Sequence, residues 1–286
     1  MAKELKTLPE DIYKLFDPNE HHELDEGNLN EFAENMKDLL RMRFAKREER
    51  EHSLRFSMLG KPDRQVWFDA HPEPGTKEEL LPKVYLKFLY GDVIEQLILL
   101  LAKEAGHSVE QEQAEVDVLG VKGHIDAIID GTVVDVKSAS SFGYKKFESN
   151  TVTEDDPFGY VAQLSGYADV LTPGEEAAWV AVDKVAGDIC VSTLAPVVIK
   201  HHPPQARIEE LRKVVESETP PERCYSDKED GKSGNRRLDV GCSYCSHKFR
   251  CWPGLRTFIY SSGPRYLTTV AREPDVSEIK GPVVEV

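Results

Sequence analysis

The chain has 286 residues and a formal net charge of −15, with 36 Lys and Arg against 51 Asp and Glu. Its hydrophobic content of 40% is enough for a core, and no stretch approaches the ~20 apolar residues that span a membrane. The acidic balance excludes a protein that coats nucleic acid with its whole surface, but not one with a local basic groove. The first residues lack the apolar segment of a signal peptide, so we expect a cytoplasmic protein.

Residues 1–53 are predicted to form a helical, acidic region, and a loop rich in Pro, Gly and His follows at 62–75. The next predicted helix begins near Gly91, and Glu95 lies beside its apolar stripe. The stripe consists of Ile94, Leu97, Ile98 and Leu101. Their i, i+3, i+4, i+7 spacing is typical of an amphipathic helix.

Residues 116–136 form a predicted β region that ends in a hairpin. Two short β-branched runs flank Asp130 and Gly131, a dipeptide favoured in two-residue type I′ turns. If that turn forms, Ile129 pairs with Thr132. This pairing then fixes the partner of every other residue along the two strands.

In this register Asp126 lies opposite Asp135, and His124 lies opposite Lys137. Because side chains alternate along a strand, Asp126, Asp135 and Lys137 share one face. The other face consists of Ile125, Ile129, Val134 and Val136. Opposed carboxylates repel each other unless something positive lies between them, and a hard cation such as Mg²⁺ or Mn²⁺ fits that place. The alternative is a solvated hairpin whose polar face meets water.

The elements after the hairpin complete a mixed α/β pattern. Asp155, Asp156 and Pro157 carry the start signals of a helix, and Gln163 and Tyr167 share one face of it. Strands are predicted at 177–182 and 189–194, a helix at 205–218, and a short strand at 283–286. The predicted domains are a helical region at 1–53, a core at 54–200, a helix and cysteine cluster at 201–260, and a tail at 261–286.

The spacing Asp-x8-Asp-x-Lys, preceded by Gly-His-Ile-Asp at 123–126, resembles the core of the PD-(D/E)xK nuclease superfamily, specifically its RecB-like branch. The elements Gly91 to Glu95 and Gln163 to Tyr167 resemble two further motifs of that branch, in the expected order. The resemblance implies a restriction-endonuclease-like core with a mixed central sheet flanked by helices. It also implies an exonuclease, of a phage type, that hydrolyses DNA ends in recombination, repair or replication-linked processing.

The resemblance further implies a set of catalytic residues: Glu95, Asp126, Asp135, Lys137, Gln163 and Tyr167. The three carboxylates, with the Val136 carbonyl, would bind Mg²⁺ or Mn²⁺. The metal would lower the pKa of a bound water and neutralise charge on the phosphate. The lysine would position or help deprotonate that water, or stabilise the phosphorane. The glutamine and the tyrosine would orient the scissile phosphate or the lysine.

Lysines mixed with aromatic residues follow the catalytic strand at Tyr144, Lys145 and Lys146. Such a mixture is typical of surfaces that follow phosphates and stack bases. His124 is a further candidate for DNA contact, or it supports the hairpin. The expected partners are DNA ends and a recombination or single-strand-binding protein, and the oligomeric state stays open.

Four of the five cysteines gather in the C-terminal third: Cys224, Cys242, Cys245 and Cys251. Their spacing suits Zn²⁺ or an iron–sulfur cluster, and a cytoplasmic chain disfavours disulfides. Iron–sulfur nucleases of the RecB-like branch, including AddB and the CRISPR-adaptation nucleases, have a similar Cys-x2-Cys-x5-Cys. In those the fourth cysteine precedes the core, whereas this chain has none before Cys190. The resemblance implies a [4Fe–4S] cluster, with Zn²⁺ as the alternative and His247 as a substitute ligand for Cys224.

Three other functions are consistent with parts of the sequence. One is a non-catalytic DNA-binding module with a structural zinc or iron–sulfur centre, which we would expect to lack a ligand or the lysine. Another is an endonuclease of the same fold. The third is a zinc enzyme that uses the cysteines in catalysis, although four available cysteines favour a closed, structural site.

Overall fold

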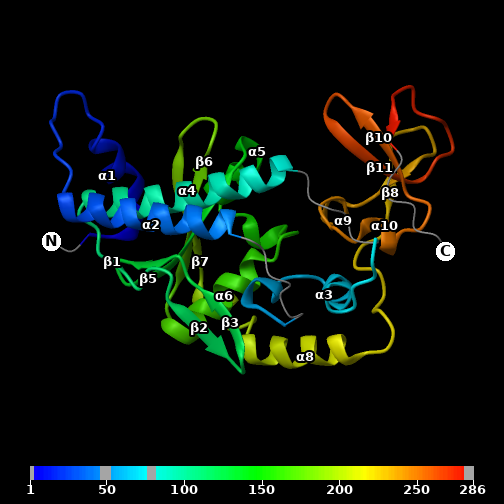
Figure 1. Cartoon of the computed structure of the whole chain (residues 1–286), viewed down its shortest axis with the longest axis horizontal. Coiled ribbons are helices and arrows are strands. Elements are labelled where there is room, and N and C mark those ends of the chain that lie inside the picture. The colour runs from blue at the N-terminus through cyan, green and yellow to red at the C-terminus, as the bar shows by residue number, and fades with distance from the viewer. Residues whose placement is uncertain (1–2, 46–52, 76–81, 280–286) are drawn as a thin grey trace. The chain divides into compact units, whose positions relative to one another are not determined.

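The computed structural model describes residues 3–45, 53–75 and 82–279 (Figure 1). The chain forms two compact units, each built from separate parts of the sequence. Unit 1 comprises Met1–Gly60 and Pro82–Ile208, and unit 2 comprises Lys61–Leu81 and Glu209–Val286. The predicted borders divide the chain consecutively, whereas the structure joins the N-terminal helices to the central sheet in one unit.

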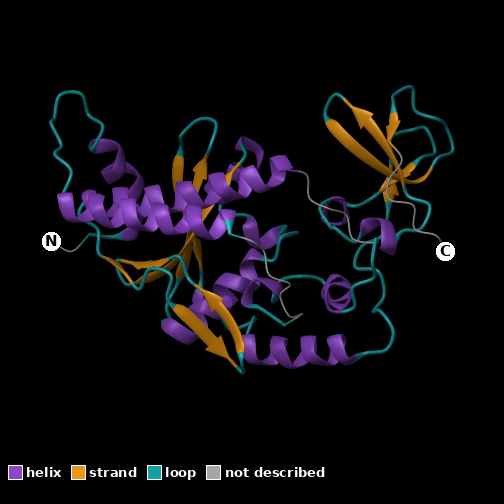
Figure 2. Cartoon of the chain, viewed as in Figure 1, coloured by secondary structure: helices purple, strands orange, loops and turns teal. Residues whose placement is uncertain are grey.

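Unit 1 contains a five-stranded mixed sheet with the order β1-β4-β5-β6-β7. The strands are β1 (Val109–Glu110), β4 (Ala127–Ile129), β5 (Thr132–Ala139), β6 (Ala177–Asp183) and β7 (Ile189–Leu194). The β5–β6 pair is parallel and the other pairs are antiparallel. The predicted α/β class with a mixed central sheet is therefore confirmed, as the strands and helices of Figure 2 show.

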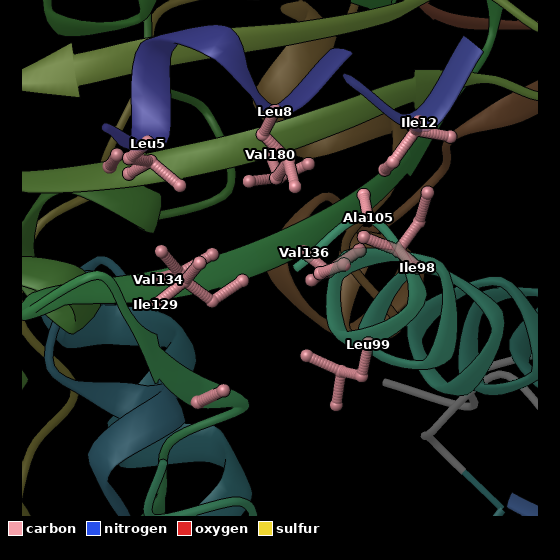
Figure 3. Packing of buried hydrophobic residues seen from close by; sticks show 13 residues of the cluster. Leu5, Leu8, Ile12, Ile98, Leu99, Ala105, Ile129, Val134, Val136 and Val180 are labelled. Atoms are coloured by element: carbon pink, nitrogen blue, oxygen red, sulfur yellow. The ribbon is translucent and has the colours of Figure 1, made fainter. Parts of the chain in front are cut away.

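Helices cover both faces of this sheet. On one face, α1 (Leu8–Lys14) and α4 (Pro82–Glu104) pack against apolar side chains of β4, β5 and β6, as Figure 3 shows for Leu8, Ile98, Val136 and Val180. On the other face, α5 (Ser141–Glu148) and α6 (Tyr160–Leu171) contact β5 and β6. Because Trp179 alternates with Val180 along β6, its contact with Phe147 of α5 marks this second face.

The β4–β5 hairpin has the predicted register, in which Ile129 pairs with Thr132. Asp130 and Gly131 have φ values of 50° and 82°, as a type I′ turn requires. The ladder ends at Ala127, so the predicted pairing of His124 with Lys137 is wrong. His124 instead ends β3 (Val121–His124), which pairs with β2 (Glu115–Val118) in a separate two-stranded sheet.

The predicted apolar stripe of α4 is only partly correct. Ile98 is buried, and Ile94 and Leu101 pack against the same core cluster, but Leu97 is 41% exposed. The long N-terminal helix α2 (Glu26–Phe44) buries none of its residues. It is attached to α4 by polar contacts, such as the bidentate ion pair of Arg43 with Asp92. Within the described ranges, no helix combines the length and the apolarity needed to cross a membrane.

The remaining elements of unit 1 are short. They are η1 (Leu5–Thr7), η2 (Phe56–Met58), η3 (Val152–Glu154) and α7 (Pro196–Ile199). The helix α8 (Pro204–Glu216) begins in unit 1 and ends in unit 2.

Unit 2 has its own antiparallel sheet, in the order β12-β10-β11-β9-β8. The strands are β8 (Lys228–Glu229), β9 (Arg236–Arg237), β10 (Arg256–Tyr260), β11 (Gly263–Thr269) and β12 (Glu278–Ile279), and the helices are α3 (Asp63–Ala70), α9 (Val240–Ser243) and α10 (Lys248–Cys251). Leu238, Phe249 and Leu255 form its core. The strands β11 and β12 lie in the segment predicted as a tail, where the sequence analysis placed no strand before 283, and the predicted strand at 283–286 lies outside the described residues.

Candidate active site

Asp135 and Lys137 of β5 point away from the apolar face of the sheet that Val134 and Val136 occupy. Asp135 is buried, and its Oδ2 lies 2.5 Å from the Lys137 Nζ. Burial alone would lower the pKa of Lys137, but Asp135 and Asp126 raise it, and the net shift is upward. The lysine is therefore a positively charged group at neutral pH.

Asp126 lies one residue before β4 and continues the hairpin with its side chain. Its Oδ2 accepts a hydrogen bond from the Val136 backbone N–H at 2.6 Å, which holds the carboxylate beside β5. Burial raises the pKa of Asp126 well above its usual range, and the charges of Asp135 and Glu95 add to this shift. The two aspartates therefore repel each other, although the paired residues of β4 and β5 end at Ala127 and Val134.

Glu95 reaches the same place from α4. Burial raises its pKa to about 7, and repulsion by Asp135 and then Asp92 contributes, while Lys137 opposes the shift. Its Oε1 accepts a hydrogen bond from Gln113 Nε2 at 2.6 Å. Like charges held together in this way are unfavourable until a cation or a proton joins them.

A cavity of about 580 Å³ in unit 1 borders Glu95. Its acidic lining residues are Glu31, Asp38, Asp92, Glu95 and Glu112. Arg43, also in the lining, is paired with Asp92. The candidate site is thus open on the side of α2 and α4, where the surroundings are strongly acidic.

Gln163 and Tyr167 lie on α6. Tyr167 is buried and stacks on Phe56, with ring centroids 4.9 Å apart. Burial raises the pKa of Tyr167 to about 12, and a hydrogen bond with Gln163 opposes the shift. Position 123 requires a glycine, because a Cβ there would lie 2.7 Å from the Tyr167 hydroxyl oxygen. The structure therefore brings this predicted pair together beside the hairpin.

Two neighbours of the site were missed in the sequence. The Lys137 Nζ lies 4.8 Å from the ring centroid of Tyr160, at the start of α6. Tyr160 precedes Gln163 by three positions and Tyr167 by seven, so helical spacing was a usable signal. Gln113, which binds Glu95, gave no such signal, since it follows from the non-local pairing of its N–H with the Asp126 carbonyl.

The predicted DNA-contact residues differ in exposure. Tyr144 is buried, so its predicted place on a base-stacking surface is wrong. Lys146 forms an ion pair with Asp155 at 2.5 Å. Lys145 and His124 are exposed, and His124 lies 3.9 Å from Glu115.

The four clustered cysteines line one small cavity of about 30 Å³ in unit 2. Burial raises the pKa of Cys242 to about 12, and the charges of the other three thiols, led by that of Cys251, add to the shift. Burial also raises the pKa of Cys245 to about 11. Burial raises the pKa of the Cys224 thiol, and hydrogen bonds from the backbone N–H groups of Arg64 and Gln65, at the start of α3, oppose this shift.

His247 is not among the residues that line this cavity. It is buried, and its Nε2 lies 2.9 Å from Asp69 Oδ1. Cys190, in β7 of unit 1, is half-buried and apart from the cluster. The thiol set in the cavity is therefore Cys224, Cys242, Cys245 and Cys251.

No protein-family model matches the chain, and no curated protein matches it in sequence. Several solved structures are similar, among them the following two. The protein SSO0001 is 19% identical with a TM-score of 0.40, over 78% of this chain and 94% of that chain. The alkaline exonuclease LHK-Exo from Laribacter hongkongensis is 12% identical with a TM-score of 0.32, over 63% of this chain and 88% of that chain. At these values both are distant likenesses.

Both sites have the donor chemistry of metal centres. Carboxylate oxygens suit Mg²⁺ and Mn²⁺, and thiolates suit Zn²⁺ or an iron–sulfur cluster. Among the described residues, no three His, Cys, Asp or Glu side chains stand grouped as a ready metal site. At the carboxylates, a cation would have to compete with Lys137 for Asp135 and with Gln113 for Glu95.

Proposed function

We propose that the protein is a deoxyribonuclease that depends on Mg²⁺ or Mn²⁺ and hydrolyses phosphodiester bonds at DNA ends. One observation carries this proposal. The charges of Asp135 and Glu95 act on Asp126, that of Asp135 acts on Glu95, and Lys137 supplies a positive charge beside Asp135. Three carboxylates in such surroundings fit a hard cation, and an adjacent ammonium fits a phosphate oxygen.

The residues of the chain have distinct parts in this reaction. Glu95, Asp126 and Asp135 would hold the metal, which supplies an activated water and charge neutralisation at the phosphate. Lys137 lies beside Asp135, and its part would be to stabilise negative charge on the phosphate oxygens. The water oxygen bonds to phosphorus, the bond from phosphorus to one sugar oxygen breaks, and that oxygen leaves as a hydroxyl with a proton that derives from the water.

Gln163 and Tyr167 would hold the lysine and the phosphate in register. Their hydrogen bond, and the packing of Tyr167 on Phe56, fix both side chains beside the hairpin. The negative charges of Asp135 and Asp126 contribute to the raised pKa of the Tyr167 hydroxyl, as expected for carboxylates in its neighbourhood. A hydrogen-bond donor that is already fixed in place orients a substrate group without further loss of side-chain entropy.

We also propose that the four clustered cysteines bind a [4Fe–4S] cluster, with Zn²⁺ as the alternative. Their convergence on one cavity supports a metal centre. Burial raises the pKa of Cys242 and repulsion by the other thiolates adds to the shift, and a cation would relieve that repulsion. The N–H groups of Arg64 and Gln65 favour a thiolate at Cys224.

The decisive experiment compares end-labelled linear DNA with covalently closed circular DNA, in Mg²⁺ and in Mn²⁺. We expect the wild type to degrade linear DNA only. Asp135→Asn and Lys137→Ala should each lower the rate by at least ~100-fold, because the first removes a charge that would hold the metal and the second a positive charge at the reacting phosphate. Lys200→Ala is the control and should retain activity, because Lys200 is an exposed lysine of unit 1 with no part in the proposed site.

Each other outcome has a definite meaning. Cleavage of circular DNA would show an endonuclease of the same site. If metal-loaded wild type cleaved no DNA at all, the nuclease proposal would be wrong, and a DNA-binding module would take its place. Full activity of both Asp135→Asn and Lys137→Ala would remove these residues from the reaction.

A further inference from the structure

Four aromatic rings form a row from the core of unit 1 to its surface. Trp179 is 1% exposed and contacts Phe147 with ring centroids 6.0 Å apart. Phe147 lies 6.2 Å from Tyr160, and Tyr160 stacks on Phe158 at 5.5 Å with an interplanar angle of 28°. Phe158 is 48% exposed. The row therefore ends in an aromatic ring at the surface.

This row passes directly by the candidate active site. The Lys137 ammonium lies 4.8 Å from the Tyr160 ring centroid, within the range of a cation–π contact. The same ammonium is paired with Asp135. Phe158 thus contacts the same Tyr160 ring as the Lys137 ammonium, which we propose to bind the scissile phosphate.

The loop that carries Phe158 is held firmly in place. The Asp156 carboxylate accepts hydrogen bonds from three successive backbone N–H groups, those of Gly159, Tyr160 and Val161, at 2.9, 3.0 and 2.8 Å. Gly159 has a φ of 78°, and a Cβ there would lie 2.5 Å from the Gly60 backbone. This close contact fixes the loop against the chain at residue 60. The ring is accordingly presented in one orientation.

We infer that Phe158 and Tyr160 form a base-stacking subsite, which takes an unpaired nucleobase at the end of a DNA strand whose phosphate lies at Lys137. The inference rests on the proposed nuclease function and names the form of DNA that the site accepts. Stacking on an aromatic ring is tolerant of sequence, because every base has a π face. A base inside a duplex is already stacked, so the subsite selects single-stranded or frayed ends.

The negative net charge of the protein explains why base stacking would add useful affinity at this site. A chain with a net charge of −15 gains little from general attraction to phosphates, and the cavity beside Glu95 is lined with carboxylates. Base stacking does not depend on charge. It therefore supplies affinity next to the reacting phosphate where electrostatic attraction is weak.

The test measures binding separately from cleavage. The probe is a single-stranded oligonucleotide with 2-aminopurine at its terminal position, titrated with the full-length protein in Ca²⁺. We expect stacking to quench the wild-type signal, and Phe158→Ala to weaken the affinity by roughly 5- to 100-fold. Phe158→Trp should restore it. A probe with a terminal abasic site should bind wild type and Phe158→Ala equally.

Phe142→Ala is the matched control, because Phe142 is an 80% exposed phenylalanine on α5 of the same unit. If Phe158→Ala binds like Phe142→Ala and wild type while wild type cleaves DNA, the subsite is overturned and the nuclease proposal stands. If wild type cleaves no DNA but quenches the probe through Phe158, the subsite stands without the nuclease. No binding of the probe by folded wild type overturns the subsite.

Discussion

Lys137 keeps its proton in surroundings where burial alone would remove it. The Asp135 and Asp126 carboxylates raise the pKa of its ammonium, and the Tyr160 ring lies beside it. Electrostatic stabilisation is the role that we propose for this lysine, because its ammonium lies beside a carboxylate that would hold the metal. The sequence predicted the partner carboxylates but not the tyrosine, which comes from another element.

Glu95 gives a prediction on the pH dependence of stability. Burial and repulsion raise its pKa to about 7 in the folded protein, from 4.5 in an unperturbed glutamate. The folded state therefore binds more protons than the unfolded state, and stability falls as the pH rises through this interval. In metal-free protein we expect Glu95→Gln to remove a loss of about 2 kcal/mol between pH 5 and 7. Urea unfolding at both pH values measures it.

Glu104, on the same helix, is the control with the opposite sign. Burial would raise its pKa, but hydrogen bonds from Asn28, His22 and the Asp25 N–H lower it overall. Its contribution to stability is present above a pH of about 4.5 and is lost below. Glu104→Gln should therefore leave the slope between pH 5 and 7 unchanged. An equal slope in wild type and Glu95→Gln would contradict the raised pKa.

At the scale of elements, the β4–β5 hairpin was predictable because its turn chemistry is local. Asp130 and Gly131 define the turn, and the turn defines the partners of the flanking residues. His124 was misplaced because the β4–β5 ladder ends at Ala127. A second two-residue turn at Leu119 and Gly120, with φ values of 52° and 77°, pairs β3 with β2 instead, and the sequence analysis missed this turn. The exposure of Leu97 depends on which helices cover α4, which periodicity does not reveal.

Gly131 provides a test of the hairpin at this scale. Its φ is 82°, and a Cβ there would meet nothing within 4 Å, so a substitution changes only the backbone preference. We expect Gly131→Val to lower the free energy of unfolding by about 1–2 kcal/mol. Gly131→Asn should cost much less, since Asn tolerates the left-handed region. Equal destabilisation by Val and Asn, measured in urea, would show that the turn is not type I′.

At the scale of the whole chain, both units combine segments that are distant in sequence. Residues 61–81 belong with the cysteine-bearing segment after 209, while residues 82–208 join the N-terminal helices. Sequence patterns are read along the chain, so the convergence of the α3 N–H groups on Cys224 was not predictable. The gathering of the four cysteines was predictable from their spacing. All of the candidate catalytic residues lie in unit 1, and the cysteine cavity lies in unit 2.

Because the cysteine cavity and the candidate catalytic residues lie in different units, we expect a metal in the cavity to act on the stability of the protein. We expect protein purified without oxygen to show visible absorption and bound iron, or bound zinc without that absorption. Cys242→Ser should remove the metal and lower the temperature at which the chain begins to unfold, because the three remaining thiols of the cavity then lose the cation that joins them. Cys190→Ser is the matched control, since Cys190 is a half-buried cysteine of unit 1. Retention of the metal by Cys242→Ser, or its equal loss in Cys190→Ser, would contradict a centre built by Cys224, Cys242, Cys245 and Cys251.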